Sequence, residues 1–449
     1  MKPYDVLVAG GGIAGSMAAI AAARAGADVL LVEEEGYLGG SLTACGTGPM
    51  MTFHAGEKQV VLGQMEELVS RLKQKNLSVG HVADTTGYTY TVTPFDSEGM
   101  KRELELMALE AGVQLLYHAG IVAVKREGEA LTGVTVSSCG SHMDLSARCF
   151  IDATGDADLL PMAQAPYDQG RALDGKDQPM TLNVRLDHVN VDKVRQLVRQ
   201  NPALFPLLVG GKEELPDKAA RLSISGFREI MAKGRADGEI TFDRDIVLCF
   251  ETNNKDEVIA NMTRVNGENP VDGWSLTRAE VEGRRQTWEL LGFLRRHVPG
   301  FENVELKFTG PRIGIRSSRR LKGSYCLTAQ DVTSAVKFAD GIAANGYPID
   351  VHSPDGARTD STHLAYGQYY TIPYRCLYHE GTANLLVAGR NISTTFEAQA
   401  STRVSPCSGV LGQAAGVAAA MAAKEGGDVR RVDVQALREA LRQANQCVD

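Results

Sequence analysis

The stretch YDVLVAGGGIAGSMAAIAAARAGADVLLVEEE, residues 4–35, decides the fold of this chain. Its first residues, 4–9, form an apolar run that is typical of a short buried strand. An alanine-rich segment follows and predicts a helix over residues 13–25, and a second apolar run then ends in acidic residues. Strand, helix and strand in this order indicate the first unit of a parallel α/β sheet.

A glycine pattern joins this strand to this helix. Gly10, Gly12 and Gly15 form G-x-G-x-x-G, and Glu33 stands at the end of the second apolar run. Glycines at this spacing permit a tight turn and a close approach to a pyrophosphate, and the helix N-terminus favours its negative charge. A carboxylate about twenty residues further on accepts hydrogen bonds from a ribose. The pattern therefore predicts a dinucleotide site, whereas a tight turn alone would need no carboxylate.

Two features favour FAD over the nicotinamide cofactors. Glu33 favours a free ribose and so disfavours NADP. The next segment, YLGGSLTACGTGP (residues 37–49), carries four glycines where a simple dehydrogenase would have its next helix. Such a backbone-rich loop can lie against a flat ring system, although a flexible surface loop is the alternative interpretation.

The middle of the chain predicts an interrupted dinucleotide fold. Helical periodicity over residues 60–76 and 96–112 is followed by a strand at 113–117 and three further strands separated by glycine-bearing turns. A strand ending in Ala153-Thr154-Gly155-Asp156 then closes the fold. A three-stranded antiparallel meander at this point is more than the ordinary NAD domain contains.

These patterns predict an α/β protein with a Rossmann-like FAD-binding domain, a three-stranded β-meander and an inserted mixed α+β substrate domain. The expected boundaries are 1–157 and 381–449 for the two parts of the FAD-binding domain and 158–380 for the substrate or cap domain. Within the insertion, residues 275–301 predict a long amphipathic helix. Its apolar stripe, which we expect to face the core, comprises Val281, Trp288, Leu291 and Leu294.

The segment NLLVAGRNIS, residues 384–393, imitates the first phosphate loop without being one. It has the apolar strand and Gly389, but Arg390 stands where the second glycine should be and no x-x-Gly follows. An irregular segment then leads to a last helix at Ser405-Pro406, where Ser405 is expected to cap the helix and Pro406 to occupy its first turn.

Taken together, these motifs resemble those of a known family. The ordered glycine motif, Glu33, the A-T-G-D strand end and NLLVAGR resemble FAD-dependent oxidoreductases of the glutathione-reductase-like two-dinucleotide-fold superfamily. Further segments, FIDATGDADL, QPMTL, RIGIRSSRRLKGSY, IPYRCL and GQAAGVAAA, are similar to a bacterial group of FAD-dependent oxidoreductases over nearly the whole chain. That group is distantly similar to fumarate reductase and succinate dehydrogenase flavoproteins and to the heterodisulfide reductase flavin subunit.

The resemblance implies where FAD would bind. Gly389 would approach the cofactor, and the N-terminus of the last helix would point at the flavin ring and stabilise its reduced anionic form. Because no histidine directly follows Gly39-Gly40, FAD is expected to be bound without a covalent link. The expected cofactor-binding residues are Gly10, Gly12, Ile13, Ala14, Gly15, Glu33, Glu34, Gly39, Gly40, Ser41, Leu42, Thr154, Gly155, Gly389, Arg390, Gly409 and Gly412.

Arginines are the main substrate candidates. Arg403 lies just before the last helix, at a place similar to the substrate-binding arginine of fumarate reductase relatives. Arg316 and Arg319 belong to a cluster of four arginines within nine residues, and either could bind substrate oxygens bidentately, although a solvated basic strand is the alternative.

A hydride transfer also needs a group that handles the proton. For that role the sequence offers His54 and Tyr370, with His363 and Tyr374 as further acid or base candidates, and their spacing does not rank them. Arg403, His54 and Tyr370 complete the predicted catalytic set.

Composition excludes several classes of partner. The chain has 449 residues, 43% of them hydrophobic, and a formal charge of −8, which disfavours nucleic acid and anionic membrane surfaces. Eight scattered cysteines without a C-x-x-C pair predict no metal site and no dithiol relay. The N-terminus enters a strand at once, and the longest apolar run near the C-terminus is short for a bilayer, so a cytoplasmic protein without membrane insertion is expected.

The predicted function is therefore an FAD-dependent oxidoreductase that moves a hydride between a small polar organic substrate and FAD. An external electron acceptor or donor is expected because the chain has no second G-x-G-x-x-G, and an oligomer is compatible with the sequence. The alternative is a flavin-bearing electron-transfer subunit of a larger redox complex. A hydrolase is disfavoured because neither G-x-S-x-G nor H-E-x-x-H occurs.

Overall fold

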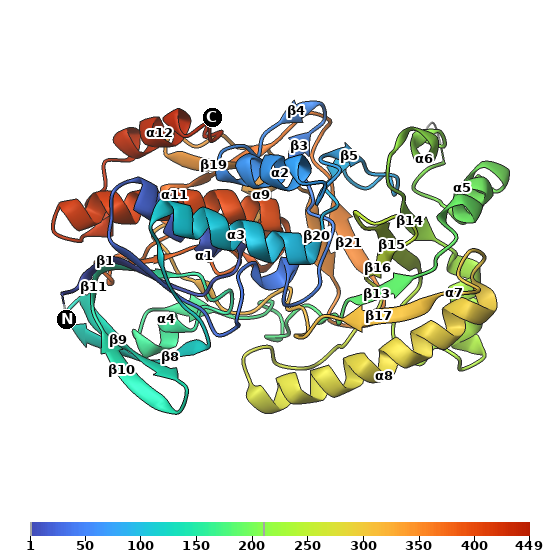
Figure 1. Cartoon of the computed structure of the whole chain (residues 1–449), viewed down its shortest axis with the longest axis horizontal. Coiled ribbons are helices and arrows are strands. Elements are labelled where there is room, and N and C mark those ends of the chain that lie inside the picture. The colour runs from blue at the N-terminus through green and yellow to red at the C-terminus, as the bar shows by residue number, and fades with distance from the viewer. Residues whose placement is uncertain (1, 210–211) are drawn as a thin grey trace.

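The computed structural model describes residues 2–209 and 212–449. Figure 1 shows two parts. One contains both ends of the chain and a parallel sheet with its helices, and the other is built from green and yellow segments of the middle of the chain. The larger of the two main hydrophobic cores lies around the parallel sheet, and the second lies in the other part.

The parallel sheet has the order β23-β11-β1-β2-β7, and every neighbouring pair in it is parallel. Four of its strands are mostly buried apolar runs, as strands covered on both faces are, whereas the edge strand β7 is partly exposed. The strand order reverses between β1 and β11, and in α/β sheets such a point opens a crevice at the carboxyl ends of the strands. The five strands are β23 (Leu385–Val387), β11 (Ala147–Asp152), β1 (Tyr4–Ala9), β2 (Val29–Val32) and β7 (Gln114–Leu116).

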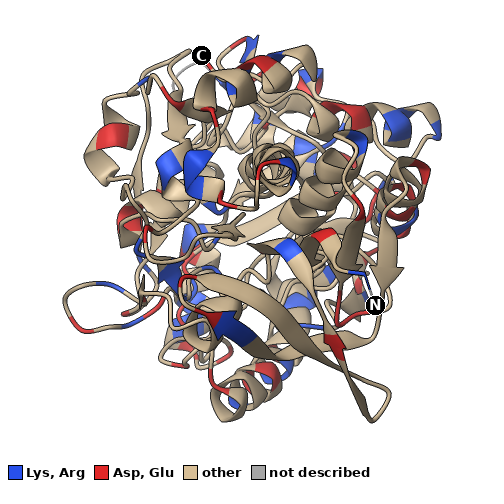
Figure 2. Ribbon diagram, turned by 90° about the vertical axis from the view of Figure 1, so that its left-hand side faces the viewer, with Lys and Arg blue, Asp and Glu red and all other residues tan. Residues whose placement is uncertain are grey.

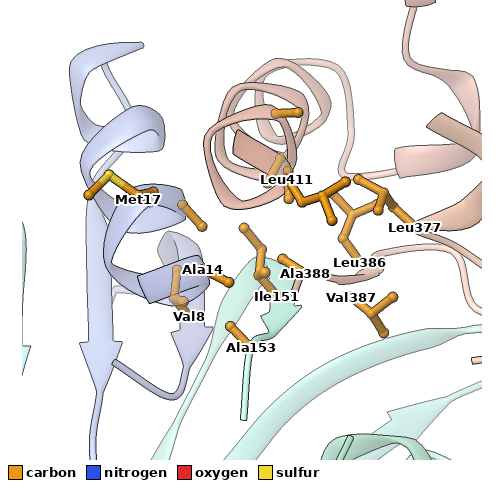
Figure 3. Close-up of a cluster of buried hydrophobic side chains, with 14 of the residues drawn as sticks. Val8, Ala14, Met17, Ile151, Ala153, Leu377, Leu386, Val387, Ala388 and Leu411 are labelled. Atoms are coloured by element: carbon orange, nitrogen blue, oxygen red, sulfur yellow. The ribbon is translucent and has the colours of Figure 1, made fainter. Parts of the chain in front are cut away.

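Two apolar helices from opposite ends of the sequence pack against each other beside this sheet. They are α1 (Ile13–Arg24) and α11 (Ser405–Lys424), and Figure 3 shows Leu411 of α11 in one buried cluster with side chains of α1, β1, β11 and β23. Glycines on α11 permit this approach. A Cβ atom on Gly412 would lie 2.0 Å from the carbonyl oxygen of Ala14, and one on Gly416 would lie 2.1 Å from that of Ala18.

The expected three-stranded antiparallel sheet forms from β8 (Ala119–Glu127), β9 (Ala130–Ser138) and β10 (Ser141–Leu145). In Figure 1 it lies across the parallel sheet from α11. Its last strand leads directly into β11, whose carboxyl end carries the A-T-G sequence.

The middle of the chain forms a second five-stranded sheet, in the order β14-β15-β16-β13-β17. It is antiparallel throughout, and the helix α8 (Gly273–His297) runs along it in Figure 1. The strands are β14 (Ser223–Gly226), β15 (Val247–Glu251), β16 (Val258–Ala260), β13 (Val184–Asp187) and β17 (Glu305–Thr309).

The remaining elements cover these two sheets or connect them. The hairpin of β20 and β21 closes one side of the site described below. The elements are β3 (His54–Ala55), β4 (Lys58–Gln59), α2 (Gln64–Gln74), β5 (Val82–Ala83), β6 (Thr91–Val92), α3 (Ser97–Ala111), α4 (Leu159–Met162), β12 (Tyr167–Asp168), α5 (Val191–Gln200), α6 (Leu215–Lys218), α7 (Arg228–Ala236), β18 (Arg320–Leu321), α9 (Ala329–Thr333), β19 (Gly341–Asn345), β20 (Ile349–His352), β21 (Thr359–Thr362), β22 (Tyr370–Pro373), α10 (Phe396–Thr402) and α12 (Val434–Gln443).

The structure corrects two local predictions near the C-terminus. The segment after Gly389 is not irregular throughout, because α10 forms within it and is capped by the Thr395 side chain, which accepts a hydrogen bond from the Ala398 amide. Ser405 is not the cap of the last helix. It is the first helical residue, and Val404 occupies the capping position.

The expected core stripe of α8 is only partly correct. Leu291 and Leu294 are buried, whereas Val281 is 62% and Trp288 is 64% exposed. The buried face of the helix carries Leu290, which belongs to the core of the second sheet, and Ala279 and Gly283, which pack near Leu182 and Ile313, so the two larger residues turn outward. The near-helical spacing of these four apolar residues therefore overstated the buried width of this helix.

Three further features of the described residues concern membrane spanning, metal binding and the distribution of charge. Helix α11 is long and apolar enough to cross a membrane by length and composition, but 89% of its apolar window is buried inside the protein. Within the same residues, no cluster of three or more His, Cys, Asp or Glu side chains could hold a metal ion. Figure 2 shows acidic and basic residues interspersed along the chain in that view.

Candidate functional site

A cavity of about 1040 Å³ runs from the carboxyl ends of β1 and β11 into the space between the antiparallel sheet and the β20–β21 hairpin. One end, which we call the glycine end, is lined by residues of the first strand–helix unit and of the A-T-G and Gly389 loops. The other end, the arginine chamber, is lined by Arg244, Arg316, Asp350 and Arg403 together with their neighbours.

The glycine end owes its shape to positions that accept no side chain. Gly10 has φ +91°, and a Cβ atom there would lie 2.7 Å from the carbonyl oxygen of Ala153. A Cβ atom on Gly15 would lie only 1.8 Å from the carbonyl oxygen of Gly10. Because the backbone of β1, α1 and the A-T-G loop is so close, the loop leaves its outer surface, at Gly12, open to the cavity.

Two helix N-termini face this cavity. Helix α1 begins at Ile13 after Gly12, and both residues line the cavity together with Ala14. Helix α11 begins at Ser405, and Ser405 and Ser408 line it from the other side. Among the described side chains none caps either helix, so the first amide groups of each helix remain available to an anionic or electron-rich ligand.

Glu33 holds the glycine loop and the segment after β2 in place through two hydrogen bonds from backbone amides. Its Oε2 atom accepts a hydrogen bond of 2.5 Å from the Gly11 amide, and Oε1 accepts one of 2.8 Å from the Glu35 amide. Burial raises the pKa of Glu33, and the two amide hydrogen bonds oppose that shift. Glu33 still lines the cavity, and its neighbour Glu34 forms an ion pair of 2.8 Å with Arg312.

The structure brings together twelve of the predicted cofactor residues in the cavity wall. They are Gly10, Gly12, Ile13, Ala14, Glu33, Glu34, Gly40, Ser41, Thr154, Gly155, Gly389 and Arg390. The other five lie behind the wall and support it by packing. Gly15 is one of these, and the others are Gly39, Leu42, Gly409 and Gly412.

The contacts of the two late glycines explain their position. A Cβ atom on Gly409 would lie 2.1 Å from the sulfur of Met65, and Gly412 packs on α1. Arg390 does face the cavity. Its guanidinium bonds to Asp156 at 2.8 Å and Ser318 at 3.1 Å and so ties the Gly389 loop to the A-T-G loop.

In the arginine chamber, Asp350 is the centre of a buried polar network. Its Oδ2 atom lies 3.3 Å from Arg403 Nη2, 3.3 Å from His352 Nε2 and 3.3 Å from the Tyr347 hydroxyl. Burial alone would raise the pKa of Asp350, but the nearby His352, Arg403 and Arg316 side chains hold it well below its usual range. Asp350 is therefore ionised at neutral pH.

His352 is neutral in this network. Burial, followed by the charge of Arg316, lowers its pKa to about 3 despite the adjacent Asp350. With Nε2 donating to Asp350, Nδ1 is left to accept from Thr359 Oγ1 at 3.3 Å and from Arg264 Nη1 at 3.4 Å. Both ring nitrogens thus have protein partners, which makes His352 a positioning group for Asp350.

Arg316 is held by neutral oxygens alone. Its Nη1 atom donates to the Pro179 carbonyl and to Thr181 Oγ1, each at 2.6 Å, and Nη2 donates to Asn261 Oδ1 at 3.3 Å. Within residues 2–209 and 212–449, no carboxylate forms an ion pair with Arg316, and burial and the charge of Arg403 lower its pKa. The chamber therefore carries an excess of positive charge.

The three other predicted catalytic or substrate residues lie elsewhere. His54 sits on β3 with Nδ1 2.9 Å from Thr91 Oγ1, and Tyr370 is fully buried against Asn345 and Ser401. Arg319 turns towards Asp158, 3.0 Å away, and the Asp156 carbonyl. The described cavity wall includes none of the three, because each is engaged by its own local partners.

Sequence reasoning missed most of the chamber. Tyr88, Tyr347, Asp350 and His352 line it, and so does Arg244. One signal was present, because Asp350 and His352 are polar residues in the otherwise apolar strand 349–352. Of the further acid or base candidates, His363 lines the cavity, whereas Tyr374 is buried and donates to the Val429 carbonyl.

Comparison with known proteins gives a family-level match over most of the chain. A family model described as FAD dependent oxidoreductase matches residues 5–441. Digeranylgeranylglycerophospholipid reductase of Methanoculleus marisnigri is 29% identical over 160 residues, which are 34% of this chain and 38% of that protein. Dihydrolipoyl dehydrogenase 3 of Pseudomonas aeruginosa is 29% identical over 192 residues, 39% of this chain and 35% of that protein.

Thiamine thiazole synthase of Aeropyrum pernix is 31% identical over 162 residues, 34% of this chain and 54% of that protein. These matches therefore span roughly a third to a half of each relative. Among solved structures, a geranylgeranyl bacteriochlorophyll reductase-like protein of Thermoplasma acidophilum aligns with 99% of this chain and 84% of its own, at 13% identity and a TM-score of 0.48. The myxobacterial chondrochloren halogenase aligns with 99% and 79%, at 16% identity and a TM-score of 0.49.

Proposed function

This chain belongs to the FAD dependent oxidoreductase family and uses FAD as its cofactor, and we propose that it transfers a hydride between a small polar organic substrate and FAD. A single observation carries the proposal. The glycine end, with its two uncapped helix N-termini, is continuous with a chamber lined by buried and half-buried arginines. A cofactor site and a substrate site thus share one cavity, which favours an enzyme over a flavin-bearing electron-transfer subunit.

The residues at the glycine end fit FAD without a covalent link. The backbone of Gly10 and Gly12 and the first turn of α1 would hold the pyrophosphate, and Glu33 stands at the ribose side. The first turn of α11 would lie at the flavin ring. When bound, FAD supplies the acceptor or donor of the hydride. The sequence has no second G-x-G-x-x-G motif for a nicotinamide cofactor that could return the flavin to its starting state, so we propose an external electron partner.

Arg403 and Arg316 would orient the substrate. Arg403 lies between α10 and α11, so α11, whose first turn would lie at the flavin ring, also fixes the position of the Arg403 guanidinium. Its Nε atom is buried and has no partner among the described residues, whereas Nη2 is held by Asp350. A hydroxyl or carboxylate oxygen of a substrate could accept from the donors of this guanidinium that Asp350 does not occupy.

His363 is the best-placed group to take the substrate proton. Burial, followed by the charge of Lys212, lowers its pKa, so its imidazole is neutral at pH 7. Its ring packs edge-on against Tyr88, with ring centroids 4.8 Å apart, and no described residue hydrogen-bonds to its nitrogens. Replacement of His363 by glutamine should slow flavin reduction by substrate and leave substrate affinity within a few-fold.

Two measurements test the proposed function. The purified protein should be yellow and should release FAD on denaturation; release of FMN, or of no flavin, contradicts the cofactor site. Under anaerobic conditions, one member of a panel of sugars, hydroxy acids, amines and enoates should bleach the flavin or reoxidise its reduced form.

A substitution at Arg403 tests whether this residue anchors the substrate. Arg403→Ala should keep the yellow colour and lose bleaching at the same substrate concentration. Arg375→Ala is a matched control, because Arg375 pairs with Asp340 at 2.8 Å outside the cavity. If bleaching survives in Arg403→Ala, the substrate is anchored elsewhere. The likeness to fumarate reductase flavoproteins stays a prediction from the sequence.

A further inference from the structure

One wall of the arginine chamber, which we call the stripe, is formed by residues of β15 (Val247–Glu251) and of the segment just before it. Arg244, Ile246, Leu248 and Phe250 all line the cavity, whereas Val247 and Cys249 belong to the second hydrophobic core on the other side. Alternate side chains of a strand point to opposite faces, so Leu248 and Phe250 share one face of β15, and Arg244 and Ile246 line the cavity from the segment that leads into the strand. The stripe is apolar over three positions and ends in a cation.

That cation, Arg244, is buried and incompletely bonded. Its exposed fraction is 4%, its Nε atom donates to the Ile246 carbonyl at 3.1 Å, and its Nη2 atom is buried without a hydrogen-bond partner among the described residues. The adjacent carboxylate of Asp245 pairs with Arg228 instead, at 3.1 Å. No carboxylate in the described part of the chain forms an ion pair with Arg244.

Without a ligand, the unpaired Arg244 guanidinium destabilises the folded protein. Burying a cation without a counter-charge is strongly unfavourable, and buried arginines are ordinarily paired with an anion. Burial, with the charge of Arg264 next, lowers the pKa of Arg244 to about 10, so the guanidinium is still protonated at pH 7. Arg264 cannot neutralise it, and its own Nη2 atom is occupied by the carbonyls of Ser353 and Arg358.

We propose that Arg244 binds a carboxylate group of the substrate and that the apolar body of the substrate lies along Ile246, Leu248 and Phe250. The inference rests on the proposed function, because it names the substrate class of the same cavity as a carboxylic acid with an apolar body. The Nη1–Nη2 edge of one guanidinium offers two parallel donors and one charge, which match a carboxylate.

The test compares hexanoate with its uncharged isostere hexanamide on the oxidised holoprotein. Binding is followed by the shift of the flavin absorbance and by the melting temperature, neither of which requires turnover. Hexanoate should bind about ten- to a hundred-fold more tightly than hexanamide, the range for a hydrogen bond to a charged group. Lengthening the chain from butanoate to hexanoate should tighten binding by about four-fold per methylene.

Variants assign this preference to a residue. In Arg244→Gln the preference for hexanoate should vanish, and in Arg244→Lys it should fall, because a lysine keeps the charge but not the paired donors. Arg235→Gln is the matched control and should keep the preference for hexanoate. Arg235 lies on the exposed side of α7 and pairs with Asp243.

Several results would overturn the subsite. These are equal binding of hexanoate and hexanamide to the unmodified protein, absence of binding for both, survival of the preference in Arg244→Gln, and tighter binding of hexyl phosphate than of hexanoate. The comparison in the unmodified protein needs no variant, so misfolding of Arg244→Gln does not prevent a decision. A protein that prefers hexanoate but is reduced by no substrate would refute the proposed function and leave this subsite standing.

Discussion

The two ends of the cavity are built in opposite ways. The glycine end is shaped by backbone, through residues such as Gly10, Gly12 and Gly389 and the first turns of α1 and α11. The arginine chamber is shaped by buried charged and polar side chains around Asp350. A backbone site depends on conformations that few residues allow, whereas a side-chain site depends on partners brought from distant segments. Substitutions at the two ends should therefore differ in their effects on FAD content and on the unfolding free energy.

The largest effect is expected from Gly15→Ala. Its new Cβ atom would lie 1.8 Å from the carbonyl oxygen of Gly10, and both atoms are fixed by the strand and the helix. We expect the unfolding free energy to fall by about 3 kcal/mol and bound FAD to drop below a tenth of the normal ratio. Flavin absorbance per protein and thermal unfolding measure this. Gly140→Ala, at an open turn between β9 and β10, should keep its FAD. Normal FAD content in Gly15→Ala would contradict a backbone-built site.

Asp350→Asn should destabilise the protein while sparing the cofactor. It removes the ion pair with Arg403 and leaves that guanidinium buried without its partner, at a cost of about 3 kcal/mol. Denaturant unfolding should show this loss, and FAD content should stay near one per chain. The control is Asp340→Asn, because Asp340 pairs with the more exposed Arg375. Loss of FAD in parallel with stability would show that the two ends do not act separately.

Gly389→Ala tests whether the second glycine loop serves the cofactor as the first does. Gly389 has φ +103°, and a Cβ atom there would lie 3.0 Å from that of Ala14, so alanine would be strained but not excluded. We expect FAD to bind about ten-fold more weakly, corresponding to about 1.4 kcal/mol. Equilibrium dialysis of the apoprotein with FAD measures it, with Gly426→Ala as a control at an open position. Unchanged affinity would place the cofactor away from this loop.

The smallest effect, visible only in a pH series, is expected from His352→Gln. The folded protein lowers the pKa of His352 from 6.5 to about 3, so this group contributes stability above pH 6.5 that is lost as the pH falls towards 3. The loss is at most roughly 1.4 kcal/mol per pH unit. Unfolding free energies between pH 7 and pH 6 should therefore fall less in His352→Gln than in the unmodified protein, by about 0.7 kcal/mol. His142→Gln, on an exposed strand, should follow the unmodified curve, and parallel curves for all three proteins would contradict a buried neutral imidazole.

The glycine end was predictable because its information is local. The spacing of Gly10, Gly12 and Gly15 between a strand and a helix specifies a backbone conformation within a few residues. The same reasoning separated the Gly389 loop from a second dinucleotide site, because Arg390 occupies the place of a glycine. Local pattern was less informative where helices meet the rest of the protein, as with Trp288 of α8, which faces outward.

The arginine chamber could not be predicted in the same way. Arg403 and Arg316 were substrate candidates from a family resemblance and from an arginine cluster, but Asp350 lies far from both in the sequence and was not a candidate. Arg319 had the same local signal as Arg316, yet only Arg316 reaches the cavity. His54 and Tyr370 were chosen by residue type, and the structure engages both with neighbours outside the cavity.

The sequence by itself determined the parallel sheet, the glycine loops and the choice of FAD, because backbone conformation and apolar periodicity are properties of short segments. Only the tertiary structure decided which polar side chains share the cavity and which are partnered elsewhere. The physical reason is that a buried charge is defined by the groups around it. Those groups come from strands and loops whose proximity no short stretch of sequence records.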